Sequence, residues 1–252
     1  MNFALSECPL GGAEMWNFSD RVVVVTGAAG NLGSAVACAF QAAGARLILV
    51  DRAPDRLPAL FPDLTDSPDH YLATGADLTD AGAAGAMVQE ALRRLGRIDV
   101  LVHTVGGYRG GQPVHETPLE TWQALFDLNV RTALTVTREV VPVMVARGAG
   151  RIVYVAAKAA LEGGKNTAAY SAAKSALLRL TESLATELRG TGVTVNCVLP
   201  STIDTPQNRA AMPKADPARW VKPEAIADVI LFLASDAARA VHGAAIPVYG
   251  AG

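Results

Sequence analysis

Short runs of β-branched and aliphatic residues alternate with longer helical patterns along most of this 252-residue chain. A continuous apolar run is typical of a strand buried on both faces of a parallel sheet. Such runs predict strands at 21–26, 46–50, 71–74, 98–103, 151–155, 193–198 and 245–249. Helical patterns lie between them, at 32–43, 82–95, 119–147, 170–189 and 223–234. The alternation predicts an α/β fold of Rossmann type, doubly wound, with a mostly parallel seven-stranded sheet and helices on both faces.

No internal repeat or low-complexity linker divides the chain, and its length suits one core. We therefore predict an N-terminal extension over 1–17 and a single domain over 18–252. The least regular region, about 201–222, follows the sixth predicted strand. Because ligands bind beyond the carboxyl ends of parallel strands, this region is the expected substrate loop.

The composition excludes several classes of partner. A net charge of −2 provides no basic surface for nucleic acid and no cationic face for a membrane. The most apolar part, 22–50, is interrupted by glycines and carries Arg46, so no transmembrane helix is predicted.

The cysteines give no sign of a metal site or a disulfide framework. Cys8, Cys38 and Cys197 are far apart and lack metal-ligand spacing. They predict reduced thiols in a cytoplasmic protein and no bound metal.

A glycine-rich stretch, TGAAGNLG over 26–33, joins the first predicted strand to the first predicted helix. Glycine allows the chain to turn sharply, so that backbone N–H groups and the helix N-terminus face a pyrophosphate. The alternative is a tight turn needed only for packing. The flanking strand and helix favour dinucleotide binding by Gly27, Gly30, Asn31, Leu32 and Gly33.

Asp51 ends the second predicted strand, 18 residues after Gly33. A carboxylate there can accept hydrogen bonds from both adenosine ribose hydroxyls and repels a 2′-phosphate, which favours NAD(H). Arg52 leaves NADP(H) open, because a guanidinium beside the ribose tolerates that phosphate.

Tyr170 and Lys174 lie four residues apart at the start of a predicted helix and so share one face. A nearby ammonium stabilises a phenolate, which would bring the pKa of the tyrosine toward a useful range. The lysine can also bind the nicotinamide ribose. The pair predicts the proton transfer that accompanies hydride transfer, and the alternative is an ordinary exposed helix face.

Over 18–252 the sequence resembles the short-chain dehydrogenase/reductase family. The matching pieces are TGAAGNLG (26–33), Asp51, ADLTD (76–80), Asn129 in LNV, YSAAK (170–174), VTVNCVLP (193–200) and PVYGAG (247–252).

The resemblance implies an acid/base role for Tyr170, a Lys174 that lowers its pKa, and an Asn129 that positions a water for proton relay. The alternative for Asn129 is a helix-interior amide bonded to backbone. The implied cofactor contacts are Asp77 and Leu78 at the adenine, Ile203 and Thr205 at the nicotinamide amide, and also Thr104, Val105, Gly106 and Pro200. In the family the equivalents of the long helices pack against a second subunit, which implies a homodimer or homotetramer.

Three departures from the family pattern stand out. Asn31 takes the place of the second glycine, and Gly30 lies one place early. The usual NNAG reads His-Thr-Val-Gly at 103–106, where His103 is expected to be a core or strand-end histidine and not a catalyst. Ala157 stands 13 positions before Tyr170, where the family has its substrate-orienting serine, and alanine has no hydrogen-bonding group.

The departures resemble a branch of the family, dihydropteridine reductase. The similar segments are AAKAALEGG (156–164), VGGYRGG (105–111) and LPSTIDTPQNRAAMPKAD (199–216). This branch prefers NADH and reduces a quinonoid dihydropterin, a conjugated imine system. An aromatic residue between two glycine pairs lines its pterin site, and Tyr108 takes that place in this chain. The predicted substrate pocket comprises Ala157, Tyr108 and Ser201.

Three hypotheses follow for the function. The first is an NADH-dependent reductase of a dihydropterin-like or other conjugated, imine-like acceptor. The second is a general alcohol/carbonyl oxidoreductase in which Ser201, Thr104 or a water replaces the missing hydroxyl. The third is a dinucleotide-binding scaffold without catalysis, which the presence of Asn129, Tyr170 and Lys174 disfavours.

Overall fold

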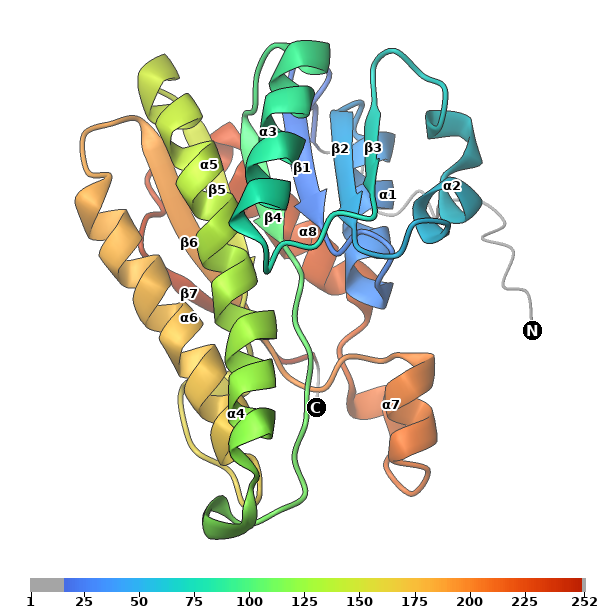
Figure 1. Cartoon of the computed structure of the whole chain (residues 1–252), viewed down its shortest axis with the longest axis vertical. Helices are drawn as coiled ribbons and strands as arrows, with labels where there is room; N and C mark the ends of the chain where they lie inside the picture. The colour runs from blue at the N-terminus through green and yellow to red at the C-terminus, as the bar shows by residue number, and fades with distance from the viewer. Residues whose placement is uncertain (1–15, 251–252) are drawn as a thin grey trace.

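The computed structural model describes residues 16–250, and its seven strands form one parallel sheet (Figure 1). The strand order is β3-β2-β1-β4-β5-β6-β7. The strands are β1 Val22–Thr26, β2 Arg46–Asp51, β3 Tyr71–Thr74, β4 Val100–His103, β5 Gly150–Val155, β6 Val193–Pro200 and β7 Ala245–Val248. The order reverses between β1 and β4, which leaves a crevice at the carboxyl ends of the strands. The predicted fold class is confirmed.

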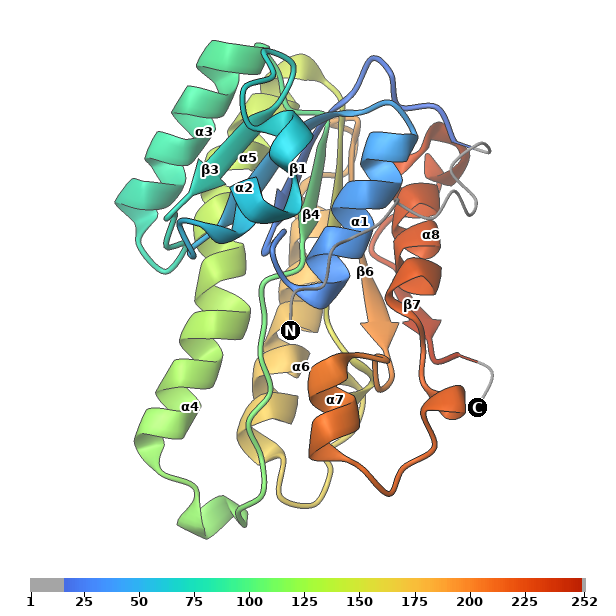
Figure 2. The same ribbon diagram turned by 90° about the vertical axis from the view of Figure 1, so that its right-hand side faces the viewer.

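Helices cover both faces of the sheet, with α1 and α8 on one side and α3, α5 and α6 on the other (Figure 2). The helices are α1 Asn31–Ala42, α2 Arg56–Leu60, α3 Ala81–Leu95, α4 Leu119–Phe126, α5 Thr132–Arg147, α6 Ala168–Glu187, α7 Pro206–Ala211 and α8 Pro223–Ala234. Successive strand residues point to opposite faces. Val23 and Val25 therefore pack in the α1/α8 layer, while Val22 and Val24 pack in the α3/α5/α6 layer.

The long helix predicted over 119–147 is divided into three segments. Its middle part, Asp127–Arg131, is a π-helix that joins α4 to α5 and contains the buried Asn129. Pro142 lies inside α5 without ending it. Single π-turns within α-helices are frequent at functional sites.

The predicted substrate loop, about 201–222, contains a helix that its irregular sequence did not indicate. Helix α7 begins after Thr205, whose side chain accepts a hydrogen bond from the Asn208 N–H at 3.1 Å. A helix of one and a half turns is too short for an apolar period to be recognised. Helices α4 and α7 extend beyond the carboxyl ends of the strands (Figure 1).

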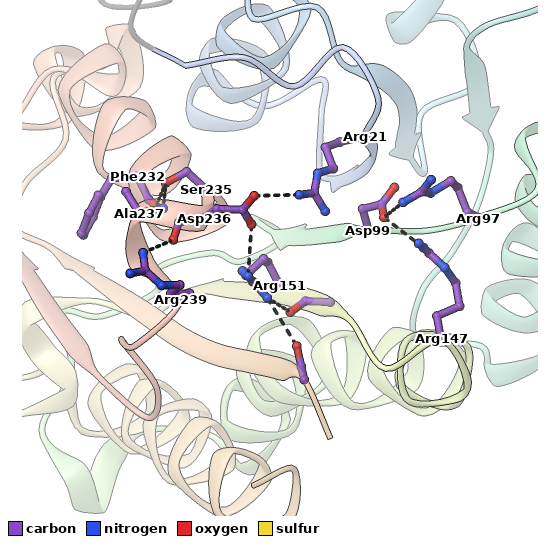
Figure 3. Close-up of polar contacts among 12 residues, drawn as sticks. Arg21, Arg97, Asp99, Arg147, Arg151, Phe232, Ser235, Asp236, Ala237 and Arg239 are labelled. Carbon is purple, nitrogen blue, oxygen red and sulfur yellow. Dashed lines mark hydrogen bonds and ion pairs between the residues drawn. The ribbon is translucent and has the colours of Figure 1, made fainter. Parts of the chain in front are cut away.

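Two carboxylates, each bound by two arginines, link elements near the amino ends of the strands (Figure 3). Asp99 is buried and accepts hydrogen bonds from Arg97 at 2.6 Å, from Arg147 at 2.9 Å and from the Val22 N–H at 2.9 Å. Asp236 is exposed and pairs with two other arginines. The first cluster joins β1, β4 and the end of α5 at the end of the sheet opposite the crevice.

Within residues 16–250, no helix is long and apolar enough to cross a membrane. The same part of the chain contains no group of three or more His, Cys, Asp or Glu that could hold a metal ion. Residues 1–15 of the predicted extension, with Cys8, and the last two residues of PVYGAG lie outside the described residues.

Candidate functional site

The glycine turn between β1 and α1 has a conformation that side chains would prevent. Gly27 has φ +69°, in the left-handed region, and a Cβ at Gly33 would collide with the carbonyl oxygen of Gly27. The Gly30 N–H donates to that same carbonyl at 2.9 Å. The turn is therefore folded tightly over the end of β1, and Leu32 is buried behind it.

Asn31, at the position of the shifted glycine, is the first residue of α1. Its side-chain amide donates to Oε1 of Gln207 in α7 at 2.8 Å. Asn31, which departs from the family's glycine pattern, thus links the glycine turn to the loop that follows β6.

Asp51 lies at the carboxyl end of β2, and its carboxylate braces the glycine turn. Its Oδ2 accepts from the Ala29 N–H at 3.1 Å, and its Oδ1 accepts from the Ala53 N–H at 3.0 Å. Arg56, which the sequence pattern did not mark, donates to the Ala29 carbonyl from the other side. The half-buried carboxylate is thus next to the turn, and the exposed Arg52 follows it in the chain.

Asp77 and Leu78 follow β3 at the same edge of the sheet. Asp77 Oδ1 accepts hydrogen bonds from the Thr79 N–H at 2.9 Å and the Thr79 hydroxyl at 2.8 Å, and these bonds lower the pKa of its carboxyl group. Leu78 is buried, and its carbonyl accepts from the Thr135 hydroxyl.

The loop after β4 lies against the glycine turn. The Thr104 hydroxyl donates to the Thr26 carbonyl at 2.7 Å, and the Val105 backbone nitrogen lies 3.1 Å from where a Cβ of Gly27 would be. A Cβ at Gly106 would lie 2.9 Å from Asn129 Oδ1 and 3.0 Å from Lys174 Nζ. Gly106 is therefore the point at which this loop meets two of the candidate residues.

Lys174 is buried on α6, and its ammonium donates to the Val155 carbonyl at 2.9 Å. Burial lowers the pKa of this ammonium to about 8. Tyr170, one turn earlier, is half-buried, and its ring meets that of Tyr108 edge to face with centroids 5.0 Å apart.

The pKa of Tyr170 moves in the direction opposite to the expected one. Burial, and to a smaller extent the neighbouring Tyr108 phenol, raise it to about 12. The expected lowering by Lys174 fails in this structure because desolvation of the phenolate dominates. At neutral pH Tyr170 is consequently a protonated phenol.

Asn129 uses its side chain to hold backbone, the alternative that the sequence left open. Its Oδ1 accepts from the Gly107 N–H at 3.1 Å, and its Nδ2 donates to the carbonyls of Gly107 and Leu125, each at 3.0 Å. The π-helix thus fixes the loop that carries Tyr108.

His103 is a fully buried core residue, as the sequence predicted. Its two ring nitrogens lie 2.9 Å from the Thr26 hydroxyl and 3.2 Å from the Thr132 hydroxyl. Burial lowers the pKa of the imidazole to about 3, so it is neutral at physiological pH.

The remaining predicted residues lie at or beyond the carboxyl ends of β5 and β6. Pro200 ends β6, Ile203 forms a bridge with Val221, and Thr205 caps α7. Ala157 is buried just beyond β5. The Ser201 hydroxyl donates to the Tyr249 carbonyl at 2.9 Å.

A cavity of about 390 Å³ lies beside Tyr170, between the loop after β4, α4 and the start of α6. Tyr108 and Ala169 are among its lining residues, whereas Ala157 and Ser201 are not. Arg109 also lines it, and its place between two glycine pairs was the sequence signal that could have marked it.

Comparisons with known proteins agree on one family. Residues 21–216 match the family described as short chain dehydrogenase. A cis-4-hydroxycyclohexanecarboxylate dehydrogenase of Sinomonas cyclohexanicum is 34% identical, and the match covers 92% of this chain and 96% of the relative. A 3-oxoacyl-(acyl-carrier-protein) reductase of Thermotoga maritima is 32% identical, with 91% and 96% covered.

The fold gives the same result. The crystal structure of levodione reductase superimposes with a TM-score of 0.84 at 29% identity, covering 93% of this chain and 98% of that one. The chain therefore belongs to the short-chain dehydrogenase family and is an NAD(P)-dependent oxidoreductase.

Proposed function

We propose that this enzyme uses NADH to reduce a conjugated or imine-like acceptor, such as a dihydropterin, with Tyr170 as the proton donor. The observation that carries this proposal is that none of the three positions considered for a second donor beside Tyr170 has a free hydroxyl for a substrate carbonyl. Position 157 is a buried alanine. The two expected substitutes, Thr104 and Ser201, donate to the backbone carbonyls of Thr26 and Tyr249. A hydroxyl has a single proton, so neither has one left for a carbonyl.

The surroundings of Tyr170 also support an acceptor of this kind. Tyr108 places an aromatic ring against Tyr170, and an aromatic edge or face suits a flat conjugated ring. A conjugated imine accepts hydride with little further polarisation, so one donor beside it is enough. The glycine pairs around Tyr108 and the pattern of 199–216 support the same reading through their resemblance to dihydropteridine reductase.

The glycine turn supports dinucleotide binding, because glycine at 27 and 33 allows the tight fold that leads into the N-terminus of α1, where a pyrophosphate is favoured. The residues proposed to hold the dinucleotide are Gly27, Gly30, Asn31, Leu32 and Gly33 at the pyrophosphate, Asp51, Arg52, Asp77 and Leu78 at the adenosine, and Thr104, Val105, Gly106, Lys174, Pro200, Ile203 and Thr205 at the nicotinamide end. When bound, NADH supplies the hydride. Lys174 uses one N–H on Val155 and has two left for ribose hydroxyls.

The protonation states favour reduction over oxidation. With a pKa of about 12, Tyr170 is protonated at neutral pH and can give its phenolic proton to the reduced acceptor. The reverse reaction needs the phenolate as a base, and that form is scarce below the pKa. Asn129 acts through the loop after β4, since it fixes Gly107 and so the position of Tyr108.

The test is steady-state NADH oxidation with a quinonoid dihydropterin and with a panel of ketones. The wild type should reduce the dihydropterin, and Ala157→Ser should leave that kcat/KM within about threefold. The same substitution should raise ketone turnover by at least about tenfold, since one well-placed donor contributes that much or more. Ala159→Ser, two residues along the chain, is the matched control and should change neither.

A second candidate function is supported by the relatives. The two named above act on an alcohol or a 3-oxoacyl group, as their names state. If the wild type reduces ketones well and the dihydropterin not at all, the general alcohol/carbonyl function replaces the proposal. If NADH binds and no acceptor is reduced, the scaffold hypothesis gains.

We expect NADH to be preferred over NADPH because Asp51 places a carboxylate at the glycine turn. Asp51→Ser should raise kcat/KM for NADPH by about tenfold, since the repulsion of the 2′-phosphate is removed while Arg52 and Arg56 stay nearby. The measurement is kcat/KM for both cofactors in wild type and variant. A wild type that prefers NADPH contradicts the assignment of Asp51.

We also propose a homodimer or homotetramer formed through the long helices. Leu119 on α4 and Leu134 and Val145 on α5 are exposed apolar side chains of these helices. Burial of such side chains against a second copy is favourable. Light scattering of the full chain gives the oligomeric state.

A further inference from the structure

The cavity beside Tyr170 has a polar lining that the proposed hydride and proton transfer does not use. Its volume of about 390 Å³ suits a small organic group. The loop after β4 contributes Arg109 and Gln112 to its lining, and the start of α6 and the loop before it contribute Ala169 and Asn166. Tyr108 borders both this cavity and the Tyr170 ring. A substrate held at Tyr170 therefore has room to extend into the cavity.

The Thr117 and Thr167 hydroxyls of this lining donate to backbone carbonyls, whereas four longer or neighbouring polar side chains have no such partner. Within residues 16–250, the exposed Arg109 guanidinium forms no ion pair and no hydrogen bond, whereas Arg97 and Arg147 both pair with Asp99. The side chains of Gln112, Thr121 and Asn166 likewise make no hydrogen bond to the described residues. A guanidinium has five N–H donors and no acceptor, so its natural partner is an anion.

The walls of the cavity are held in place by backbone bonds. The Gly111 N–H donates to the Asn166 carbonyl at 2.8 Å, which ties the loop after β4 to the loop before α6. Asn166 adopts φ +61°, which asparagine tolerates better than most residues. On the other side of Arg109, Asn129 fixes Gly107. The backbone of the loop is therefore held on both sides of Arg109, and less ordering of that backbone is needed when a ligand binds.

The charge on the lining of the cavity is positive only. No aspartate or glutamate is among its lining residues, and Arg109 is its one charged side chain. Ala168 and Ala169 are the first residues of α6, and the Thr167 side chain does not cap that helix. The positive end of the helix adds to the field of the guanidinium, although the cation and the cavity carry the inference.

We propose that this cavity binds a carboxylate on the substrate and that Arg109 is the residue that selects for it. The proposal rests on the proposed function in one respect, that the reacting end of the substrate lies at Tyr170 and Tyr108. It extends that function by naming the substrate class, an acceptor with an anionic arm. Arg109 takes no part in proton or hydride transfer and determines specificity by binding.

The first experiment measures binding without turnover. Isothermal titration of the NADH-loaded enzyme compares pterin-6-carboxylate with 6-hydroxymethylpterin, which differ in charge. The carboxylate should bind about tenfold more tightly, the size expected for hydrogen bonds to a charged group at an exposed site. The preference should shrink as salt is raised.

The second experiment compares kcat/KM for charged and neutral acceptors of two chemical kinds. One pair is the quinonoid dihydropterins with and without a 6-carboxylate, and the other is 4-acetylbenzoate and acetophenone. Arg109→Gln should abolish the preference for the charged member, chiefly through KM, and Arg109→Lys should restore part of it. Arg189→Gln, beyond the opposite end of α6, is the matched control.

The outcomes separate the two proposals. If the ketone pair is reduced with a charge preference that Arg109→Gln abolishes, and neither dihydropterin is reduced, the carboxylate site stands and the imine-like acceptor is wrong. If the dihydropterins are reduced equally well in wild type and Arg109→Gln, the acceptor class stands and the carboxylate site is wrong. Equal binding of both pterins, with no charge preference in either acceptor pair, also overturns the carboxylate site.

Discussion

Replacing Tyr170 with phenylalanine should lower kcat for every accepted acceptor by about 10³-fold, within the usual range for removal of a general acid. The ring remains, so its edge-to-face contact with Tyr108 is kept and the cavity wall is unchanged. What is lost is the phenolic proton, which a pKa of about 12 keeps on the oxygen at neutral pH. Ala157 has no hydroxyl and those of Thr104 and Ser201 donate to backbone carbonyls, so none of these three positions supplies a replacement proton.

The measurement pairs turnover with cofactor binding. Dissociation constants for NADH, from fluorescence titration, should differ by less than about threefold between wild type and Tyr170→Phe, since a lost neutral hydrogen bond contributes little to binding. Tyr71→Phe, on β3 and remote from the crevice, controls for the loss of a tyrosine hydroxyl. If Tyr170→Phe turns over at the wild-type rate, the proposed mechanism is wrong.

The sheet could be predicted because its strands are buried on both faces. Each residue of Val22–Thr26 is buried, so the run is almost wholly apolar, and its short length and β-branched residues favour a strand over a helix. The exact ends of the strands could not be predicted from these runs. β6 extends to Pro200, two residues further than predicted, because its pairing with β7 continues to Pro200 and Val248.

The glycine turn could be predicted for a similar reason. Backbone at Gly27 and Gly33 is confined by geometry that only glycine satisfies, so the residue type reports the conformation directly. The link from Asn31 to Gln207 could not be predicted, because it joins residues 176 positions apart through a short helix with no sequence period.

The pKa values of the site residues depend on burial, which the spacing of residues in the sequence does not reveal. Tyr170 and Lys174 are neighbours on α6, as their spacing predicted. Yet the desolvation of both groups, not their mutual charge, moves their pKa values. The role proposed for Arg109 likewise depends on the cavity, which is formed by loops and helices far apart in the sequence.

Replacing Asp99 with alanine should lower the free energy of unfolding by about 3 kcal/mol, the size expected when one partner of a buried ion pair is removed. The carboxylate is 2% exposed and receives hydrogen bonds from two guanidiniums and the Val22 N–H. Without it, the N–H at the start of β1 loses its partner and two arginines face each other (Figure 3).

Asp236→Ala is the matched control, because Asp236 also pairs with two arginines but its side chain is 69% exposed. That substitution should change the free energy of unfolding by less than about 1 kcal/mol. Both variants are measured by urea unfolding followed by circular dichroism at one protein concentration. If both variants lose the same free energy of unfolding, burial of the carboxylate is not what makes Asp99 more stabilising than Asp236.

The contribution of Asp99 to the free energy of unfolding should be lost at low pH. The two arginines and the Val22 N–H outweigh burial and hold the pKa of this carboxyl below its usual 3.8. The stabilisation is therefore fully present above about pH 4 and is lost as pH falls through the folded-state pKa.

His103, whose pKa is lowered to about 3, also destabilises the fold in acid, beginning near its usual 6.5. Because wild type and Asp99→Ala share His103, the difference between their unfolding free energies isolates Asp99. That difference should stay constant from pH 8 to pH 5 and shrink at pH 3, and a constant difference at all three values contradicts the ion-pair account.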